Sequence, residues 1–135
     1  MKKLIAVFFL LFSTTVFSDV AIISSDYNIT RIEALNIFSL NDFTFADGGK
    51  VKMIVLPRDH YTTRTFTRAL SMTPARFFDK AESAFSTGKL NLLVIMESDR
   101  EVYRYILKTD GAIGYVQDHI IDDRLVPSVI RLRGY

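Results

Sequence analysis

The chain has 135 residues, a formal net charge of +2 and no cysteine. Lys2 and Lys3 carry the excess charge, so residues 19–135 are electrically balanced and their bulk charge does not favour a nucleic-acid partner. The absence of cysteine excludes disulfides and thiol nucleophiles. The length after residue 18 suits one domain that buries about two-thirds of its unfolded surface.

The first 18 residues have the features of a cleaved export signal. A charged start precedes an apolar core over residues 4–12, and residues 16–18 form an acceptable cleavage site. That core is too short to span a bilayer, and no later segment reaches the roughly 20 apolar residues that a transmembrane helix needs. We therefore expect a periplasmic domain, residues 19–135, that does not span the membrane.

Strand and helix patterns alternate in this domain. Residues 20–23 form an apolar, β-branched run that is typical of a buried strand. Thr30 and Glu33 have the spacing of a capping box, which predicts a helix start. The side chains of this helix expected to face inward are Ile32, Leu35 and Phe38.

A second strand leads into two further helices. A turn at residues 47–49 precedes a strand over residues 51–56. Thr62 or Thr63 is expected to cap the next helix. The helix after that, over residues 73–88, has a capping threonine, a proline at its first position and a terminal glycine.

The last part of the chain repeats the alternation. Residues 90–96 predict a strand, and the capping box at residues 98–101 begins a helix that Gly111 closes in a left-handed conformation. Gly114 is expected to let another backbone approach closely. The last predicted strands cover residues 112–116 and 126–132. This order predicts one α/β domain with a mixed, mostly parallel sheet flanked by helices, with parallel pairing wherever a helix separates two strands.

Two loops have the chemistry of an anion site. Ligands bind beyond the carboxyl ends of strands in such sheets, and a helix start offers an oxyanion unpaired N–H groups and the positive end of a dipole. One loop follows the first strand and the other follows the second strand, where it runs into a helix. The candidate anion-binding residues of the two loops are Ser24, Ser25, Asp26, Arg58, Thr62, Thr63 and Arg64.

Several segments, taken in order, resemble the short phosphate ABC transporter substrate-binding proteins, small relatives of the periplasmic phosphate-binding protein. The matching segments after the signal are residues 19–25, the helix 32–38 with its end at 37–38, and residues 45–49, 56–57 and 111–116. The resemblance implies a periplasmic-binding-protein-like fold of type II. It also implies binding of phosphate or a similar oxyanion, which is handed to an inner-membrane permease.

The chain also departs from the pattern of this family. Larger family members enclose phosphate between two lobes, with a Ser/Thr loop after the first strand and an Arg…Ser-Gly-Thr loop at a helix start. Ser24 and Ser25 match the first loop. Arg58 matches the second, but residues 59–63 replace Ser-Gly-Thr and lack its glycine. Because the chain is less than half the length of a two-lobed binder, we expect a more open and weaker site.

Phosphate at neutral pH retains a proton that needs an acceptor. Asp26 and Asp59 are the candidate carboxylates of the two loops. Each has a structural alternative, because Asp26 could only shape a turn and Asp59 could only neutralise Arg58 or Arg64.

Neither catalysis nor a metal or other cofactor is expected. His60 and His119 are the only imidazoles, and no glycine-rich phosphate loop is present. His119 with its neighbouring aspartates, residues 118–123, does not match a usual metal-ligand pattern. The alternative function is a binding-protein-like domain that docks on a membrane sensor or porin without transporting. Its candidate apolar patches are residues 77–78 and 43–45.

Overall fold

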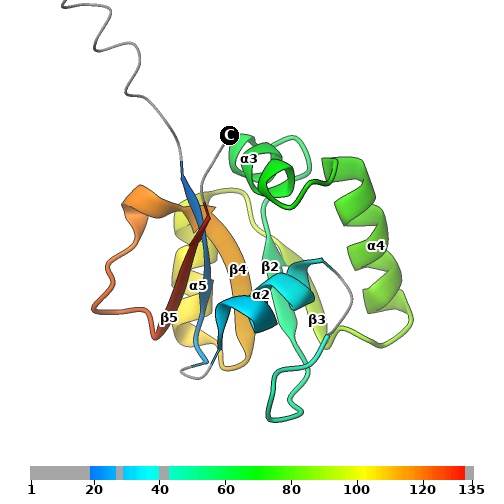
Figure 1. Cartoon of the computed structure of the whole chain (residues 1–135), viewed down its shortest axis with the longest axis horizontal. Coiled ribbons are helices and arrows are strands. Elements are labelled where there is room, and N and C mark those ends of the chain that lie inside the picture. The colour runs from blue at the N-terminus through cyan, green and yellow to red at the C-terminus, as the bar shows by residue number, and fades with distance from the viewer. Residues whose placement is uncertain (1–18, 27–28, 40–42, 133–135) are drawn as a thin grey trace, which may run out of the picture.

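The computed structural model describes residues 19–26, 29–39 and 43–132. Its elements are β1 (Val20–Ser24), α2 (Arg31–Phe38), β2 (Lys52–Val55), α3 (Tyr61–Ala69), α4 (Pro74–Ser86), β3 (Leu92–Ile95), α5 (Asp99–Lys108), β4 (Ala112–Gln117), the 3-10 helix η1 (Asp118–Ile120) and β5 (Ser128–Leu132), as Figure 1 shows. The predicted order of strands and helices is confirmed. The expected export signal, residues 1–18, lies outside the described residues.

The five strands form one mixed sheet in the order β3-β2-β4-β1-β5. β2 pairs in parallel with β3 and with β4, whereas β1 pairs antiparallel with β4 and with β5. Four strands therefore run in one direction and β1 runs against them. The mixed, mostly parallel sheet is confirmed. Parallel pairing across every helix is not, because β1 lies two strands away from β2 and meets β4 instead.

Helices cover both faces of the sheet (Figure 1). Tyr115 and Gly114 of β4 point to opposite faces of the sheet, because side chains alternate along a strand. The ring of Tyr115 stacks on Phe66 of α3 at a centroid distance of 4.1 Å, and Phe38 of α2 and Phe77 of α4 complete this aromatic cluster. Its neighbour Gly114 faces Val102 and Ile106 of α5. The core therefore has an aromatic layer under α2, α3 and α4 and an aliphatic layer under α5.

The two glycines near β4 behave as predicted. Gly111 has a φ of 76°, in the left-handed region that glycine adopts without strain. It follows the C-cap of α5, Thr109, by two residues. A Cβ on Gly114 would lie 2.7 Å from the carbonyl oxygen of Ile54 and 2.7 Å from Cδ1 of Ile106, so the close backbone approach is confirmed.

Three local predictions need correction. Ile32 is 74% exposed, and α2 buries Ala34, Ile37 and Phe38, which share one face through their i, i+3, i+4 spacing. The capping box at Thr30 and Glu33 is confirmed.

At the start of α5, Ser98 accepts from the N–H of Glu101, but the Glu101 carboxylate accepts from the N–H of Glu97, so the second predicted capping box is incomplete. The cap of α3 is His60, neither Thr62 nor Thr63.

The paired phenylalanines are core residues. Phe77 and Phe78 are 0% and 2% exposed, and Phe45 is buried as well. Phe45, Phe77 and Phe78 therefore do not form the apolar docking patch that the alternative function would use, whereas Phe43 of the same predicted patch is half-buried and packs against the core.

Candidate functional site

The two predicted anion loops lie at opposite edges of the sheet. Because β1 runs against β2 and β4, its carboxyl end lies where those strands begin, and Ser24 pairs with Ile113 near the start of β4. The loop after β2 lies at the other edge, where β2, β3 and β4 end. The structure therefore separates Ser24, Ser25 and Asp26 from the remaining candidates.

The serines after β1 bind backbone groups. The Ser24 hydroxyl, fully buried, donates to the carbonyl of Ala112 at 3.0 Å and accepts from the N–H of Asp26 at 3.0 Å. The Ser25 hydroxyl donates to the carbonyl of Thr109 at 2.8 Å. These bonds fasten the end of β1 to the turn between α5 and β4, and the Ser128 hydroxyl donates to the carbonyl of Asp26.

The start of α3 lies directly beyond the carboxyl end of β2. His60 is the N-cap residue, and its Nδ1 accepts from the N–H of Thr62 at 3.1 Å. Thr62 and Thr63 follow in the first turn, and both are fully buried. The sequence folds this way because the apolar residues of β2 continue only to Leu56, where Pro57 follows, and a polar segment then leads into α3 (Figure 1).

Asp99 ties this helix start to its neighbours. Its Oδ2 accepts from the Thr62 hydroxyl at 3.2 Å, and its Oδ1 accepts from the backbone N–H of Gln117 at 3.0 Å. The Gln117 side-chain amide donates to the Thr62 hydroxyl at 3.3 Å. The Asp99 Oδ2 also lies 3.8 Å from Nε2 of His60. One half-buried carboxylate therefore connects the starts of α3 and α5 with the end of β4.

Thr63 belongs to a second, deeper set of hydrogen bonds. Its hydroxyl shares a 2.8 Å hydrogen bond with the Tyr115 hydroxyl, which accepts from the N–H of Leu56 at 3.2 Å. Burial is the main cause that raises the pKa of Tyr115 above its ordinary range, and the hydrogen bonds with Thr63 and Leu56 partly oppose it. Tyr115 is therefore neutral across the physiological pH range.

The two arginines flank the start of α3 on the outside. Arg58 turns toward α4, where its guanidinium lies 3.8 Å from a carboxylate oxygen of Asp79 and 5.6 Å from the ring centroid of Phe78. Arg64 donates to the backbone carbonyl of Asp59 and lies 6.0 Å from the ring centroid of Tyr61. Both arginines are exposed, so their charges face solvent at this edge of the sheet.

Sequence reasoning missed the roles of Asp99, Gln117 and Tyr115. In the sequence, Asp99 falls within the predicted capping box at residues 98–101, and Tyr115 falls within the predicted strand at residues 112–116. Asp99 and Gln117 could have been found with the rule that ligands bind beyond the carboxyl ends of parallel strands, which was applied to residues 58–64. Gln117 ends a strand and Asp99 begins a helix after a strand, so both lie at the carboxyl edge of the parallel strands.

The aspartates near His119 are engaged with arginines. Asp118 and Asp123 bind the Arg131 guanidinium at 2.6 and 2.8 Å, and Asp122 binds Arg124. Across the described ranges 19–26, 29–39 and 43–132, no group of three or more His, Asp or Glu side chains could hold a metal ion. Within the same ranges, no helix has the length and apolar character needed to cross a membrane.

Two solved structures share this fold. An ABC-type phosphate transport receptor from Vibrio cholerae matches 84% of this chain and 46% of its own, with a TM-score of 0.60 and 12% sequence identity. A putative phosphate ABC transporter substrate-binding protein from Clostridium perfringens, solved with bound phosphate, matches 79% of this chain and 42% of its own, with a TM-score of 0.58 and 13% identity. The chain thus has a periplasmic-binding-protein-like α/β fold and spans less than half the length of either structure. No family model and no curated protein matches its sequence.

Proposed function

We propose that this chain is a periplasmic binding protein for phosphate or a similar small oxyanion. The observation that carries the proposal is the position of the α3 start. It lies beyond the carboxyl end of β2, between the parallel partners of that strand, with Arg58 in the segment before it and Arg64 in its first turn. Ligands of open α/β sheets bind at this edge, and a helix start favours an anion through its N–H groups and its dipole.

The proposed ligands are the backbone N–H groups of Thr62 and Thr63 and the guanidinium groups of Arg58 and Arg64. The threonine hydroxyls are already engaged by Asp99 and Tyr115, so they position the helix start and leave the anion to the backbone. The His60 imidazole accepts from the N–H of Thr62, so an anion at that group would replace it. An arginine presents planar, charge-assisted donors that match an oxyanion.

The proposed site leaves out Ser24, Ser25 and Asp26. Their polar groups hold the opposite edge of the sheet together. This leaves Asp59, exposed in the loop before α3, as the proposed acceptor for the proton of bound phosphate. A carboxylate in that position would favour phosphate over sulfate, because sulfate has no proton to share at neutral pH.

The proposal also includes the location of the protein and its membrane partner. We expect export by residues 1–18 to the periplasm, delivery of the anion to an inner-membrane permease, and no catalysis. The fold shared with two phosphate-receptor structures supports this setting. The exposed arginines predict weaker binding than an enclosed site would give.

Calorimetric titration of the purified protein with phosphate, and with sulfate as control, tests the proposal at low ionic strength. Phosphate is expected to bind and Arg64→Ala to weaken binding by about tenfold, because it removes a charge-assisted donor. Arg104→Ala on α5 makes the same change away from the site and should leave the affinity unchanged. Ser25→Ala should also leave it unchanged. Absence of phosphate binding, or equal losses in Arg64→Ala and Arg104→Ala, would contradict the proposal.

A further inference from the structure

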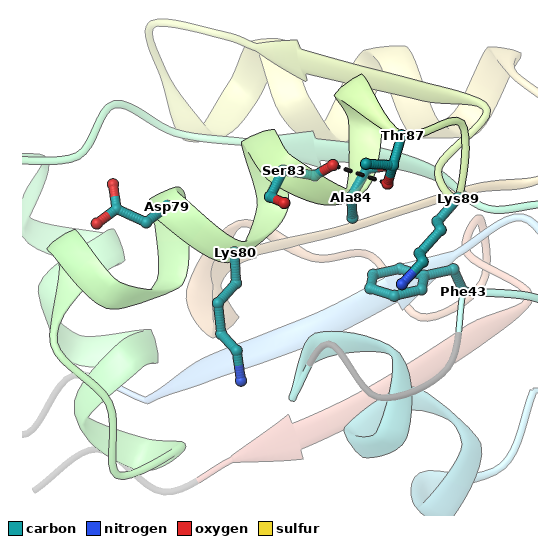
Figure 2. A pocket seen from close by; sticks show the side chains of 7 residues that line it. All are labelled: Phe43, Asp79, Lys80, Ser83, Ala84, Thr87 and Lys89. Atoms are coloured by element: carbon teal, nitrogen blue, oxygen red, sulfur yellow. Dashed lines mark hydrogen bonds between the residues drawn. The ribbon is translucent and has the colours of Figure 1, made fainter.

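A basic hollow runs along α4, apart from the start of α3. Figure 2 shows its first part, a space of about 330 Å³ in which the side chains of Lys80 and Lys89 project to one side of α4 beside Phe43. Asp79 points the other way in the same view, toward its partner Arg58. Asp79 still lines this space, and its carboxylate lies 3.8 Å from the Arg58 guanidinium.

A second hollow lies nearer the start of α4. This space of about 580 Å³ shares Lys80 with the first and is lined also by Arg68 and Arg76. Leu70 and Met72, from the connection between α3 and α4, supply apolar surface there. We call these two spaces, which share Lys80, the α4 groove. Its defining residues are Phe43, Arg68, Leu70, Met72, Arg76, Lys80 and Lys89.

The α4 groove is cationic on a chain whose domain is electrically balanced. Four basic side chains and one carboxylate, that of Asp79, line it, so the positive charges predominate. Asp79 lies 3.8 Å from Arg58, and no carboxylate among the described residues forms an ion pair with Arg76, Lys80 or Lys89. A concave surface with an excess of one sign of charge attracts a partner of opposite charge.

The spacing of these cations fits an extended partner. Arg76 and Lys80 lie one turn apart, and the helix continues for about 9 Å from Lys80 to Ser86 before Lys89 follows. A single small oxyanion would reach one or two of these side chains. An extended acidic chain would reach all of them and would cover Phe43, Leu70 and Met72 as it passes.

We propose that the α4 groove binds an acidic segment of a protein partner, with carboxylates on the cations and apolar side chains on Phe43, Leu70 and Met72. A concave groove with an apolar floor fits a peptide segment better than a flat membrane surface. The balanced charge of the domain gives no general attraction for nucleic acid. The proposal goes beyond anion binding at the start of α3 and does not depend on it.

Fluorescence anisotropy with a labelled peptide of glutamate and leucine tests the inference. The triple variant Arg76→Glu, Lys80→Glu, Lys89→Glu is expected to weaken peptide binding by about tenfold or more. The matched triple variant on α5, Arg100→Glu, Arg104→Glu, Lys108→Glu, changes the net charge equally and is expected to retain most of the affinity. Circular dichroism confirms that both variants fold before they are compared.

Several results would overturn the proposal. One is an equal loss in the two triple variants, which would show attraction by net charge alone. Another is the absence of saturable peptide binding to the unmodified protein. Phosphatidylglycerol vesicles form a separate arm, and vesicle binding that depends on the α4 cations while peptide binding does not would assign the groove to a membrane. Phosphate titration of the α4 variant separates the two sites, because phosphate affinity should persist there if the anion binds at α3.

Discussion

The Thr62 hydroxyl donates a 3.2 Å hydrogen bond to the carboxylate of Asp99, which joins the first turns of α3 and α5 across the end of the sheet. The other oxygen of the same carboxylate accepts from the N–H of Gln117. Two helix starts and a strand end therefore depend on one half-buried side chain. This arrangement fixes the direction in which the N–H groups of α3 point.

Replacing Asp99 by alanine should destabilise the fold by about 1–3 kcal/mol, because the Thr62 hydroxyl and the Gln117 N–H both lose their acceptor in a partly buried place. Asp99→Asn keeps one oxygen acceptor and should cost less. Urea unfolding followed by circular dichroism measures both effects. Glu97→Ala, exposed just before α5, is the control and should change stability by no more than about 0.5 kcal/mol. Equal stability of Asp99→Ala and the unmodified protein would show that this junction is not structural.

Tyr115→Phe tests the buried hydrogen bonds beneath α3. The phenylalanine ring retains the stacking on Phe66, but the N–H of Leu56 and the Thr63 hydroxyl lose a partner, so we expect a loss of about 1–3 kcal/mol at neutral pH. Tyr105→Phe, half-buried on α5, is the matched control. A cost no greater than that of the control would mean that the hydroxyl contributes nothing.

The same substitution should change the response to alkali. Burial raises the pKa of Tyr115 in the folded protein, so the folded state retains a proton that the unfolded chain loses above about pH 10. Stability that is complete below this pH therefore falls as pH rises further. Unfolding curves at successive alkaline pH values should show a shallower decline for Tyr115→Phe than for the unmodified protein. Parallel declines would contradict the assignment.

His60 is expected to hold the first turn of α3 through its imidazole nitrogen. His60→Ala removes the acceptor of the Thr62 N–H and should cost about 0.5–2 kcal/mol, the usual range for loss of a helix cap. His60→Asn supplies another capping acceptor and should restore most of this stability. Thermal unfolding compares the variants. If asparagine were as destabilising as alanine, the imidazole would matter for its packing and its capping bond would be incidental.

Most of the fold could be predicted because local signals agree with tertiary packing. Thr30 with Glu33, Thr73 before Pro74, and the turn at Gly48 each use backbone chemistry that few other residues provide. The direction of β1 could not be predicted in this way. Its apolar run fits a buried strand of either direction, and its antiparallel neighbours β4 and β5 are distant in sequence. Strand direction here depends on nonlocal pairing.

The direction of β1 determines how much of the candidate site could be predicted. Arg58, Thr62, Thr63 and Arg64 lie near one another because they are close in sequence at the end of a parallel strand. Ser24 and Ser25 were assigned to the same site on the expectation that β1 also ends there. Asp99 follows β3 and Gln117 ends β4, and only the pairing of these two strands with β2 brings them to the site.

Gly114 tests the packing of β4 against β2 and α5. An alanine Cβ at this position would lie 2.7 Å from the backbone carbonyl of Ile54, which cannot move without shifting β2. We expect Gly114→Ala to destabilise the fold by about 1–3 kcal/mol, the usual cost of overpacking a core. At Gly49, which has no positive φ, the added carbon would meet the flexible side chain of Asp47 at 3.2 Å, so Gly49→Ala should cost much less. Urea unfolding measures both variants. If Gly114→Ala were as stable as Gly49→Ala, α5 and β2 would accommodate the added carbon easily. The close approach at Gly114 would then contribute little to the packing of β2.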